Sequence, residues 1–364
     1  MANQQIFVLG TDGNLWLEEG PFGKQIPPAR VQVDGNVNLY AAFQAFYWNE
    51  IFVCGSDGNL WLEEGPFGTV PLPGSSYPPS QSSRFQIDGS VGAFYAWEPG
   101  QVFVLGNDGN LWLEFGFGTT IPAVPPPRYP VDGNVAEFQP VSLDEVFVLG
   151  QDGNLWQEFG PFGTVPLPSC NGGTSGCRNQ VDANVHSFWA VDSENVFVIG
   201  TDGNLWLEQG QFGKQIPPAR VQVDGNVAGI WAVDSSTIYV LGTDGNLWLE
   251  HAPFGTVPLP PCSQTSGFGK GFGCRDLIYS NVAAFGYFPD AGGVFVVDGN
   301  LNLWQVGTPS VQIDGNVIAF QPLSSAQMLM RKATGAGKGS RTPRPVRPVR
   351  AKVPALSSGQ RKRV

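Results

Sequence analysis

The sequence is poor in the residues that most often carry catalysis or metal binding. Its 364 residues include only two histidines, His186 and His251, and only five cysteines. Neither histidine belongs to a nucleophile or metal-binding motif, and GxSxG, HExxH and phosphate-binding glycine loops are absent. An active site needs an asymmetric constellation of side chains, whereas most acidic residues in this chain recur at equivalent positions of a repeat. We therefore predict a non-enzymatic protein with no metal site and no cofactor.

Long apolar runs and a basic N-terminal leader are also missing. No apolar segment approaches the ~18 residues of a transmembrane helix, and MANQQIFVLG lacks the basic and apolar regions of a signal peptide. The apolar content of 42% is still sufficient for a hydrophobic core, and 48 glycines with 31 prolines indicate many turns. The sequence thus predicts a turn-rich fold with no membrane span.

The charges are distributed unequally along the chain. Residues 331–364 contain 11 Lys and Arg and no acidic residue, whereas residues 1–330 contain 9 basic and 31 acidic groups. The overall net charge of −11 therefore combines a body of −22 with a basic tail. Its Pro, Gly and basic content predicts that the tail, 331–364, is disordered. This tail either contacts a polyanion or lies against the acidic body of residues 1–330.

A sevenfold repeat determines the predicted fold. The string DGNLW recurs six times, followed by a degenerate NLNLW, at intervals of 42 to 56 residues, which are typical of propeller blades. A second motif, VDGNV or a variant of it, also occurs seven times. Each repeat contains four segments typical of short strands, exemplified by NVAEFQPV, VFVLG, NLWLE and RVQVD. We predict an all-β, seven-bladed β-propeller with four strands per blade.

The two ends of the repeat region predict how the ring closes. The chain begins in a second strand at Ile6, and its last clear segment, NVIAFQPL, is a first strand. We therefore expect the N- and C-terminal strands to complete one blade together. The segment AQMLM, residues 326–330, is interpreted as a degenerate second strand or a capping strand.

The connections between strands differ in how much they vary. The Asp-Gly turns between second and third strands predict hairpins in which both central residues have positive φ. Neither these turns nor the VDGN connections between repeats match the spacing of a calcium loop, so turn chemistry explains both. The loops between third and fourth strands vary most and are expected on the opposite face. They are either binding loops or unconstrained Pro-rich connectors.

Arginine and glutamate each occupy one repeat position in the body. All six arginines lie four residues before the Asp of the second motif or its equivalent, and six glutamates lie two residues after the repeated Trp. Alternation along the third strand, with the fourth strand antiparallel beside it, predicts Arg–Glu pairs that join these strands. The alternative is a ring of anion-binding arginines. The seventh repeat has Val306 and Ser310 instead. The predicted pairs comprise Arg30, Arg84, Arg128, Arg178, Arg220 and Arg275 with Glu18, Glu63, Glu114, Glu158, Glu208 and Glu250.

The repeated tryptophans have two possible roles. They either pack between adjacent blades or offer an aromatic face to a sugar ring. The resulting ligand-binding candidates are Trp16, Trp61, Trp112, Trp156, Trp206, Trp248 and Trp304.

Four cysteines bracket two of the variable loops. Cys170 with Cys177, and Cys262 with Cys274, lie at equivalent loop ends, which predicts two local disulfides. Cys54 replaces an aliphatic residue of VFVLG and is expected to be buried. Disulfides indicate an oxidising compartment, so extracellular export by an unconventional route is favoured over thiols that stay reduced.

The repeats resemble two known families. VFVLGTDGNLWLE resembles the repeats of tectonin-type propeller lectins and related seven-bladed bacterial lectins, over most of residues 1–330. That resemblance implies a propeller that binds carbohydrate, and only the repeat tryptophans carry over as site residues. DGNLWLE is also similar to the DGNLWFTE of streptogramin lyases, another seven-bladed family. Their His/Glu catalytic cluster would correspond in this chain only to His186 and His251.

These observations favour a multivalent binding protein. Weak sites repeated on one rigid ring gain avidity when several engage the same surface. The favoured partners are glycans or glycoconjugates. A protein-interaction scaffold is the second non-enzymatic hypothesis, and a streptogramin-lyase-like enzyme is the enzymatic alternative.

Overall fold

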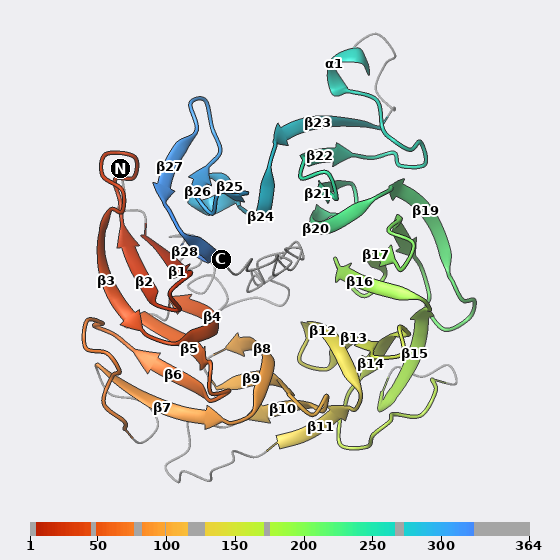
Figure 1. The fold of residues 1–364 in the computed structure, drawn as a ribbon. Helices are drawn as coiled ribbons and strands as arrows, with labels where there is room; N and C mark the ends of the chain where they lie inside the picture. Colours follow the sequence, from red (N-terminus) through yellow and green to blue (C-terminus); the bar gives the residue numbers. More distant parts are fainter. Residues whose placement is uncertain are drawn as a thin grey trace, which may run out of the picture.

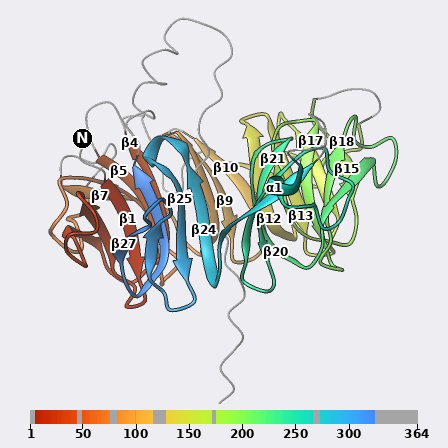
Figure 2. The same ribbon diagram turned by 90° about the horizontal axis from the view of Figure 1, so that it is seen from above.

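The chain folds into a ring of seven four-stranded antiparallel sheets (Figure 1). The computed structural model describes residues 5–44, 49–75, 82–98, 100–115, 128–170, 175–265 and 273–323. Each sheet is one blade, with its first strand nearest the axis and its fourth strand at the rim. Figure 2 shows the ring from the side. These sheets confirm the predicted seven-bladed β-propeller.

The strands of each blade follow one another from the axis to the rim. Blade 1 comprises β28 (Val317–Leu323), β1 (Gln5–Gly10), β2 (Leu15–Glu19) and β3 (Ala29–Asp34). Blades 2 to 4 comprise β4 (Val37–Gln44), β5 (Asn49–Gly55), β6 (Leu60–Glu64) and β7 (Ser83–Asp88); β8 (Val91–Glu98), β9 (Gln101–Gly106), β10 (Leu111–Phe115) and β11 (Arg128–Asp132); and β12 (Val135–Ser142), β13 (Glu145–Gly150), β14 (Leu155–Phe159) and β15 (Cys177–Asp182). Blades 5 to 7 comprise β16 (Val185–Ala190), β17 (Asn195–Gly200), β18 (Leu205–Gln209) and β19 (Ala219–Asp224); β20 (Val227–Asp234), β21 (Thr237–Gly242), β22 (Leu247–His251) and β23 (Cys274–Tyr279); and β24 (Val282–Phe288), β25 (Gly293–Asp298), β26 (Leu303–Gln305) and β27 (Val311–Asp314).

Blade 1 closes the ring with strands from both ends of the repeat region. β28 pairs antiparallel with β1, in a register that places Gln321 opposite Phe7. This pairing confirms the expected closure. The segment 326–330 and the basic tail 331–364 lie outside the described residues.

The hydrophobic core lies between neighbouring blades. The second strand of each blade is buried on both sides, as its uninterrupted apolar sequence predicts. One cluster, for example, joins Phe103 of blade 3 to Phe138 and Val146 of blade 4. Each blade therefore needs its neighbours to bury its apolar surface, which favours a closed ring.

The turn between second and third strands differs from the predicted type. In blade 4, Asp152 accepts hydrogen bonds from the backbone N and the Nδ2 of Asn154, at 3.0 and 2.7 Å. Gly153 has φ 79°, but no aspartate of these turns has positive φ. Only the glycine therefore occupies the left-handed region, because the Asp and Asn side chains stabilise the rest of the turn.

We expect the substitution Gly153→Ala to destabilise the protein by about 1 kcal/mol, because alanine is strained at positive φ. Urea denaturation followed by tryptophan fluorescence measures this loss. The substitution Gly74→Ala is the matched control, since a Cβ at Gly74 meets no atom within 4 Å and its φ is not positive. Equal denaturation midpoints for the two variants would contradict the left-handed conformation of Gly153.

Backbone hydrogen bonds join each blade to the next through the same turns. Thr201 N of blade 5 donates to Asn184 O of blade 4 at 2.8 Å, and Val227 N of blade 6 donates to Gly203 O of blade 5 at 3.0 Å. Asn184 has φ 59°, a conformation that asparagine tolerates better than most residues. The equivalents of both bonds recur around the ring. The near-invariant turns are therefore explained by their structural role.

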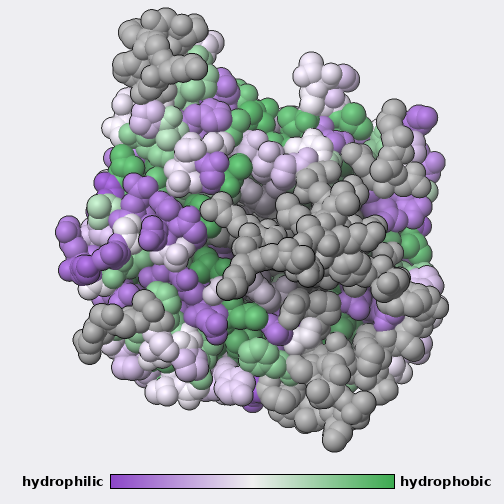
Figure 3. All heavy atoms as spheres, turned by 180° about the vertical axis from the view of Figure 1, so that it is seen from behind, coloured by the Kyte–Doolittle hydropathy of each residue, from purple (hydrophilic) through white to green (hydrophobic). Residues whose placement is uncertain are grey.

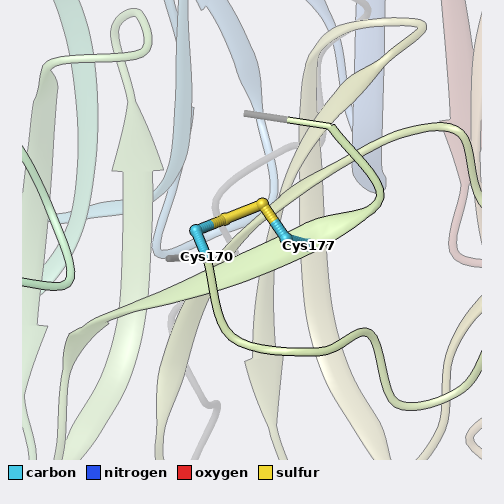
Figure 4. The surroundings of a disulfide bond; sticks show 2 residues. All are labelled: Cys170 and Cys177. Carbon is cyan, nitrogen blue, oxygen red and sulfur yellow. A yellow bond between two sulfur atoms is a disulfide. The ribbon is translucent and has the colours of Figure 1, made fainter. Parts of the chain in front are cut away.

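Two disulfides close variable loops between third and fourth strands, as predicted. Cys170 is bonded to Cys177 (Figure 4) and Cys262 to Cys274. The second loop contains α1 (Cys262–Thr265), and a 3₁₀ turn, η1 (Pro289–Ala291), precedes β25. No helix in the described ranges is long and apolar enough to span a membrane. Cys54 is buried, as expected, and burial raises the pKa of its thiol to about 11.

Candidate functional site

A repeated arginine joins neighbouring blades. In blade 5, Arg220 Nη1 lies 3.4 Å from Asp182 Oδ2, which belongs to the second motif of blade 4. All six body arginines make the equivalent contact with the preceding blade, at 3.4 to 3.9 Å. Their aspartate partners are Asp314, Asp34, Asp88, Asp132, Asp182 and Asp224.

The same arginine also contacts the glutamate and the tryptophan of its own blade. Arg220 Nη1 lies 3.7 Å from Glu208 Oε1, and its guanidinium carbon lies 4.3 Å from the centre of the Trp206 ring. Five blades have the Arg–Glu contact within 4.0 Å, and Arg128 of blade 3 stacks on Trp112 without one. The sequence predicts a link between two strands of one blade; the structure adds a link between blades.

The six glutamates of this cluster are fully buried. Burial, followed by the negative charge of the neighbouring aspartate, raises the pKa of Glu158 to about 9 despite the opposing effect of Arg178. Neither carboxyl oxygen of Glu158 accepts a hydrogen bond from the described residues. The pKa values of the other five glutamates are raised to about 8 or 9, and burial is again the largest cause. The raised pKa values favour the protonated, neutral form of these glutamates, which leaves the aspartate as the main counterion of each arginine.

The interface between blades 6 and 7 lacks all three charged members. Tyr279 replaces the aspartate, Val306 the glutamate and Ser310 the arginine. Tyr279, Val306 and Trp304 pack against one apolar cluster. The Nε1 of Trp304 donates a hydrogen bond to Asp298 at 3.0 Å. The charged set is thus replaced as a unit by apolar packing.

Sequence reasoning missed the aspartates of the second motif as partners of the arginines. It explained their Asp-Gly-Asn strings by turn chemistry, and Asp182 does accept a hydrogen bond from the backbone N of Ala183. The available signal was the coincident loss of aspartate, glutamate and arginine at Tyr279, Val306 and Ser310. Because Tyr279 belongs to the repeat before Val306, that coincidence indicates a contact between blades.

A groove opens beside this cluster at the interface between blades 4 and 5. It has a volume of about 500 Å³ and is lined by Trp206, Arg220, Thr201, Asp202 and the pair Ile216–Pro217. Asp182 and Asn184 of blade 4 form its other side. The loop between third and fourth strands therefore reaches the turns of the preceding blade. The loop leaves β18 at the end away from these turns, as expected, but its segment Ile216–Pro217 folds back along the interface to reach them.

The apolar rim of the groove recurs at five interfaces. Ile216 is 46% exposed and precedes Pro217 through a cis peptide bond. An exposed Val or Ile followed by a cis proline occupies the same position in four other blades. Exposed apolar residues on the face in Figure 3 are interspersed with polar ones. The five rim residues are Ile26, Val70, Val165, Ile216 and Val257.

The repeat tryptophans are half-buried, and arginine covers one face of six of them. That face is not open to a sugar ring. Within the described residues, none of these six indole N–H groups donates a hydrogen bond to protein. None of the six nitrogen atoms is completely buried. The six indole N–H groups therefore have no protein acceptor in the described part of the chain.

The axis of the ring holds a second cavity, of about 670 Å³. It is lined by first-strand residues, among them Tyr40, Phe94, Trp189 and His186. His251 ends β22 in another blade, so the structure does not place the two histidines on one strand or in one blade. In the part of the chain that the structure describes, no three His, Cys, Asp or Glu residues are grouped for metal binding.

No family model and no curated protein matches this chain. Among solved structures it is similar to Prp20p from Saccharomyces cerevisiae, reported with its binding properties to Gsp1p and histones, at 12% identity and a TM-score of 0.44, over 92% of this chain and 95% of that one. It is also similar to human WBSCR16, at 11% identity and a TM-score of 0.39, over 68% and 73% of the two chains. These similarities assign no function to this chain.

Proposed function

We propose that this propeller is a multivalent carbohydrate-binding protein whose sites are the grooves between blades. The observation that supports this function is the recurrence of one groove chemistry around the ring. An indole edge, a partly exposed arginine, aspartate oxygens and an aliphatic rim meet at the blade 4–5 interface. Such a mixture of apolar surface and oriented polar groups suits small ligands. Several weak sites on one rigid body give avidity toward a glycan-coated surface.

A glycan array probed with the full chain at high glycan density tests this proposal. We expect selective binding that the double variant Thr201→Arg/Thr243→Arg weakens at least about tenfold. Thr201 is an exposed residue that lines the blade 4–5 groove, and Thr243 is its equivalent in blade 6. The variant Ser193→Arg/Ser236→Arg adds the same charge at exposed positions before the second strands and should bind normally.

Absence of binding to any glycan at high density would reject the carbohydrate proposal. The second candidate is then a protein-interaction scaffold, which the axial cavity supports because apolar and aromatic side chains line it. The streptogramin-lyase-like alternative needs a His/Glu cluster, and His186 and His251 belong to different blades. Turnover of a cyclic lactone that is lost on changing His251 would support that enzyme instead.

A further inference from the structure

We propose that the grooves between blades recognise the acetamido group of N-acetylated sugars, with the indole edge donating to its carbonyl and the aliphatic rim contacting its methyl group. This inference rests on the proposed carbohydrate-binding function and specifies its ligand. It predicts five equivalent sites, one at each groove with an Ile or Val rim residue.

One residue of the groove carries a hydrogen-bond donor that has no partner in the described part of the chain. Trp206 lines the groove, and its Nε1–H makes no hydrogen bond to the described residues and is not a buried unpartnered atom. Trp304, in the interface that lacks the charged cluster, already donates its Nε1–H to Asp298. An indole N–H can only donate, so a ligand that displaces water from this donor must supply an acceptor.

The charges of the groove favour a neutral acceptor. The single guanidinium of Arg220 pairs with Asp182 and shares the groove with a second carboxylate, that of Asp202. Hydrogen bonds from Asn204 lower the pKa of Asp202, which keeps it ionised, while buried Glu208 is neutral at pH 7. The charged groups of the groove therefore total about −1, which disfavours a carboxylate or sulfate on the ligand. An amide carbonyl is an uncharged acceptor.

An aliphatic rim lies beside the donor. Ile216 and Pro217 line the same groove as Trp206, and Ile216 is 46% exposed. A sugar that carries only hydroxyl groups leaves this apolar surface uncovered. A methyl group placed against it gains roughly fourfold in affinity, if it is buried as a methylene is. An acetamido group combines this methyl with a neutral carbonyl acceptor.

The indole N–H resonances of the full-length protein, labelled with ¹⁵N-tryptophan, provide the test. The probes are methyl N-acetyl-β-glucosaminide, methyl β-glucoside and methyl β-glucuronide, each titrated at pH 7. We expect the acetamido sugar to shift indole signals of the repeat tryptophans saturably, and the glucoside to bind at least fourfold more weakly. The Trp304 signal should not move, because its N–H already donates to Asp298. Trp206→Phe assigns the blade 5 signal.

Two variants distinguish an effect of the rim residue on binding from an effect on folding. Ile216→Ser should weaken the acetamido shift of Trp206 at least fourfold and leave the other grooves unchanged. Val233→Ser is the matched control, since Val233 is 42% exposed and does not line the groove. Unchanged melting temperatures show that both variants are folded.

The outcomes distinguish the inference from the proposed function. Equal shifts with glucoside and acetamido sugar, or preference for the glucuronide, would overturn acetamido recognition while carbohydrate binding stands. Shifts with none of the three sugars, but selective array binding of other glycans, would also overturn the acetamido inference alone. No shift with any sugar and no binding on the array would reject both.

Discussion

Replacing Arg178 with serine is expected to lower the melting temperature of the propeller by about 6 °C. Arg178 Nη1 lies 3.6 Å from Asp132 and 3.7 Å from Glu158, and its guanidinium stacks on Trp156 at 4.1 Å. The side chains of Asp132 and Glu158 are 9% and 0% exposed. Removing the cation leaves Asp132 without its counterion, at a cost of about 3 kcal/mol, and a domain of this size loses roughly 2 °C per kcal/mol.

The chain itself provides a design that should reverse much of this loss. The interface between blades 6 and 7 has Tyr279, Val306 and Ser310 in place of Asp, Glu and Arg, and it packs with apolar contacts. The triple variant Asp132→Tyr/Glu158→Val/Arg178→Ser copies that set into the interface between blades 3 and 4. Because a buried ion pair can be replaced by packed apolar groups at little cost, we expect the triple variant to regain at least half of the lost stability.

Differential scanning calorimetry of the single and triple variants measures both effects. Lys214→Ser is the control for loss of an exposed positive charge, and it should leave the transition unchanged. An unaltered transition for Arg178→Ser would show that the cluster does not stabilise the ring. A triple variant less stable than the single one would show that the seventh interface depends on its wider surroundings.

The fold could be predicted because its signals are local and repeated. Each VFVLG run, Asp-Gly turn and Trp-x-Glu spacing is a pattern of two to five neighbouring residues, and its recurrence in six or seven repeats removes the ambiguity of a single short strand. Ring closure through β28 and β1 followed from the same repeat phase. The type of turn could not be predicted in this way, because hydrogen bonds such as the one that Asn154 N donates to the Asp152 side chain override the preference of the isolated dipeptide.

The candidate site was only half predictable because it lies between blades. Cross-strand register places Glu208 opposite Arg220 within one sheet, which alternation along the strands anticipates. The contact of Arg220 with Asp182 depends on how blade 5 packs on blade 4, and no local pattern reports that packing angle. The return of Ile216 to this groove depends on the path of the loop that follows β18. A repeat indicates such contacts only where a whole set of partners is lost together.

The stability of the propeller is expected to fall as the pH rises from about 5 to about 9. Glutamate in an unfolded chain has a pKa near 4.5, whereas burial raises that of Glu158 to about 9 in the fold. Between these values the folded protein holds a proton that the unfolded chain has released, so stability decreases with rising pH. Below about 4.5 both states are protonated and this contribution is fully present. Burial also raises the pKa of Asp132, which acts in the same direction at lower pH.

Glu158→Gln separates a neutral glutamic acid from an ionised one. Glutamine matches the shape of the protonated acid and carries no charge, so at pH 6 the variant should lose less than about 1 kcal/mol. Between pH 5.5 and 8.5 it should lose stability less steeply than the natural chain, by roughly 1 kcal/mol or more. Urea titrations at both pH values measure this difference, with Gln215→Glu as an exposed control. If Glu158 were instead an anion paired with Arg178, the glutamine variant would lose about 3 kcal/mol at pH 6, because the substitution would remove one partner of a buried ion pair.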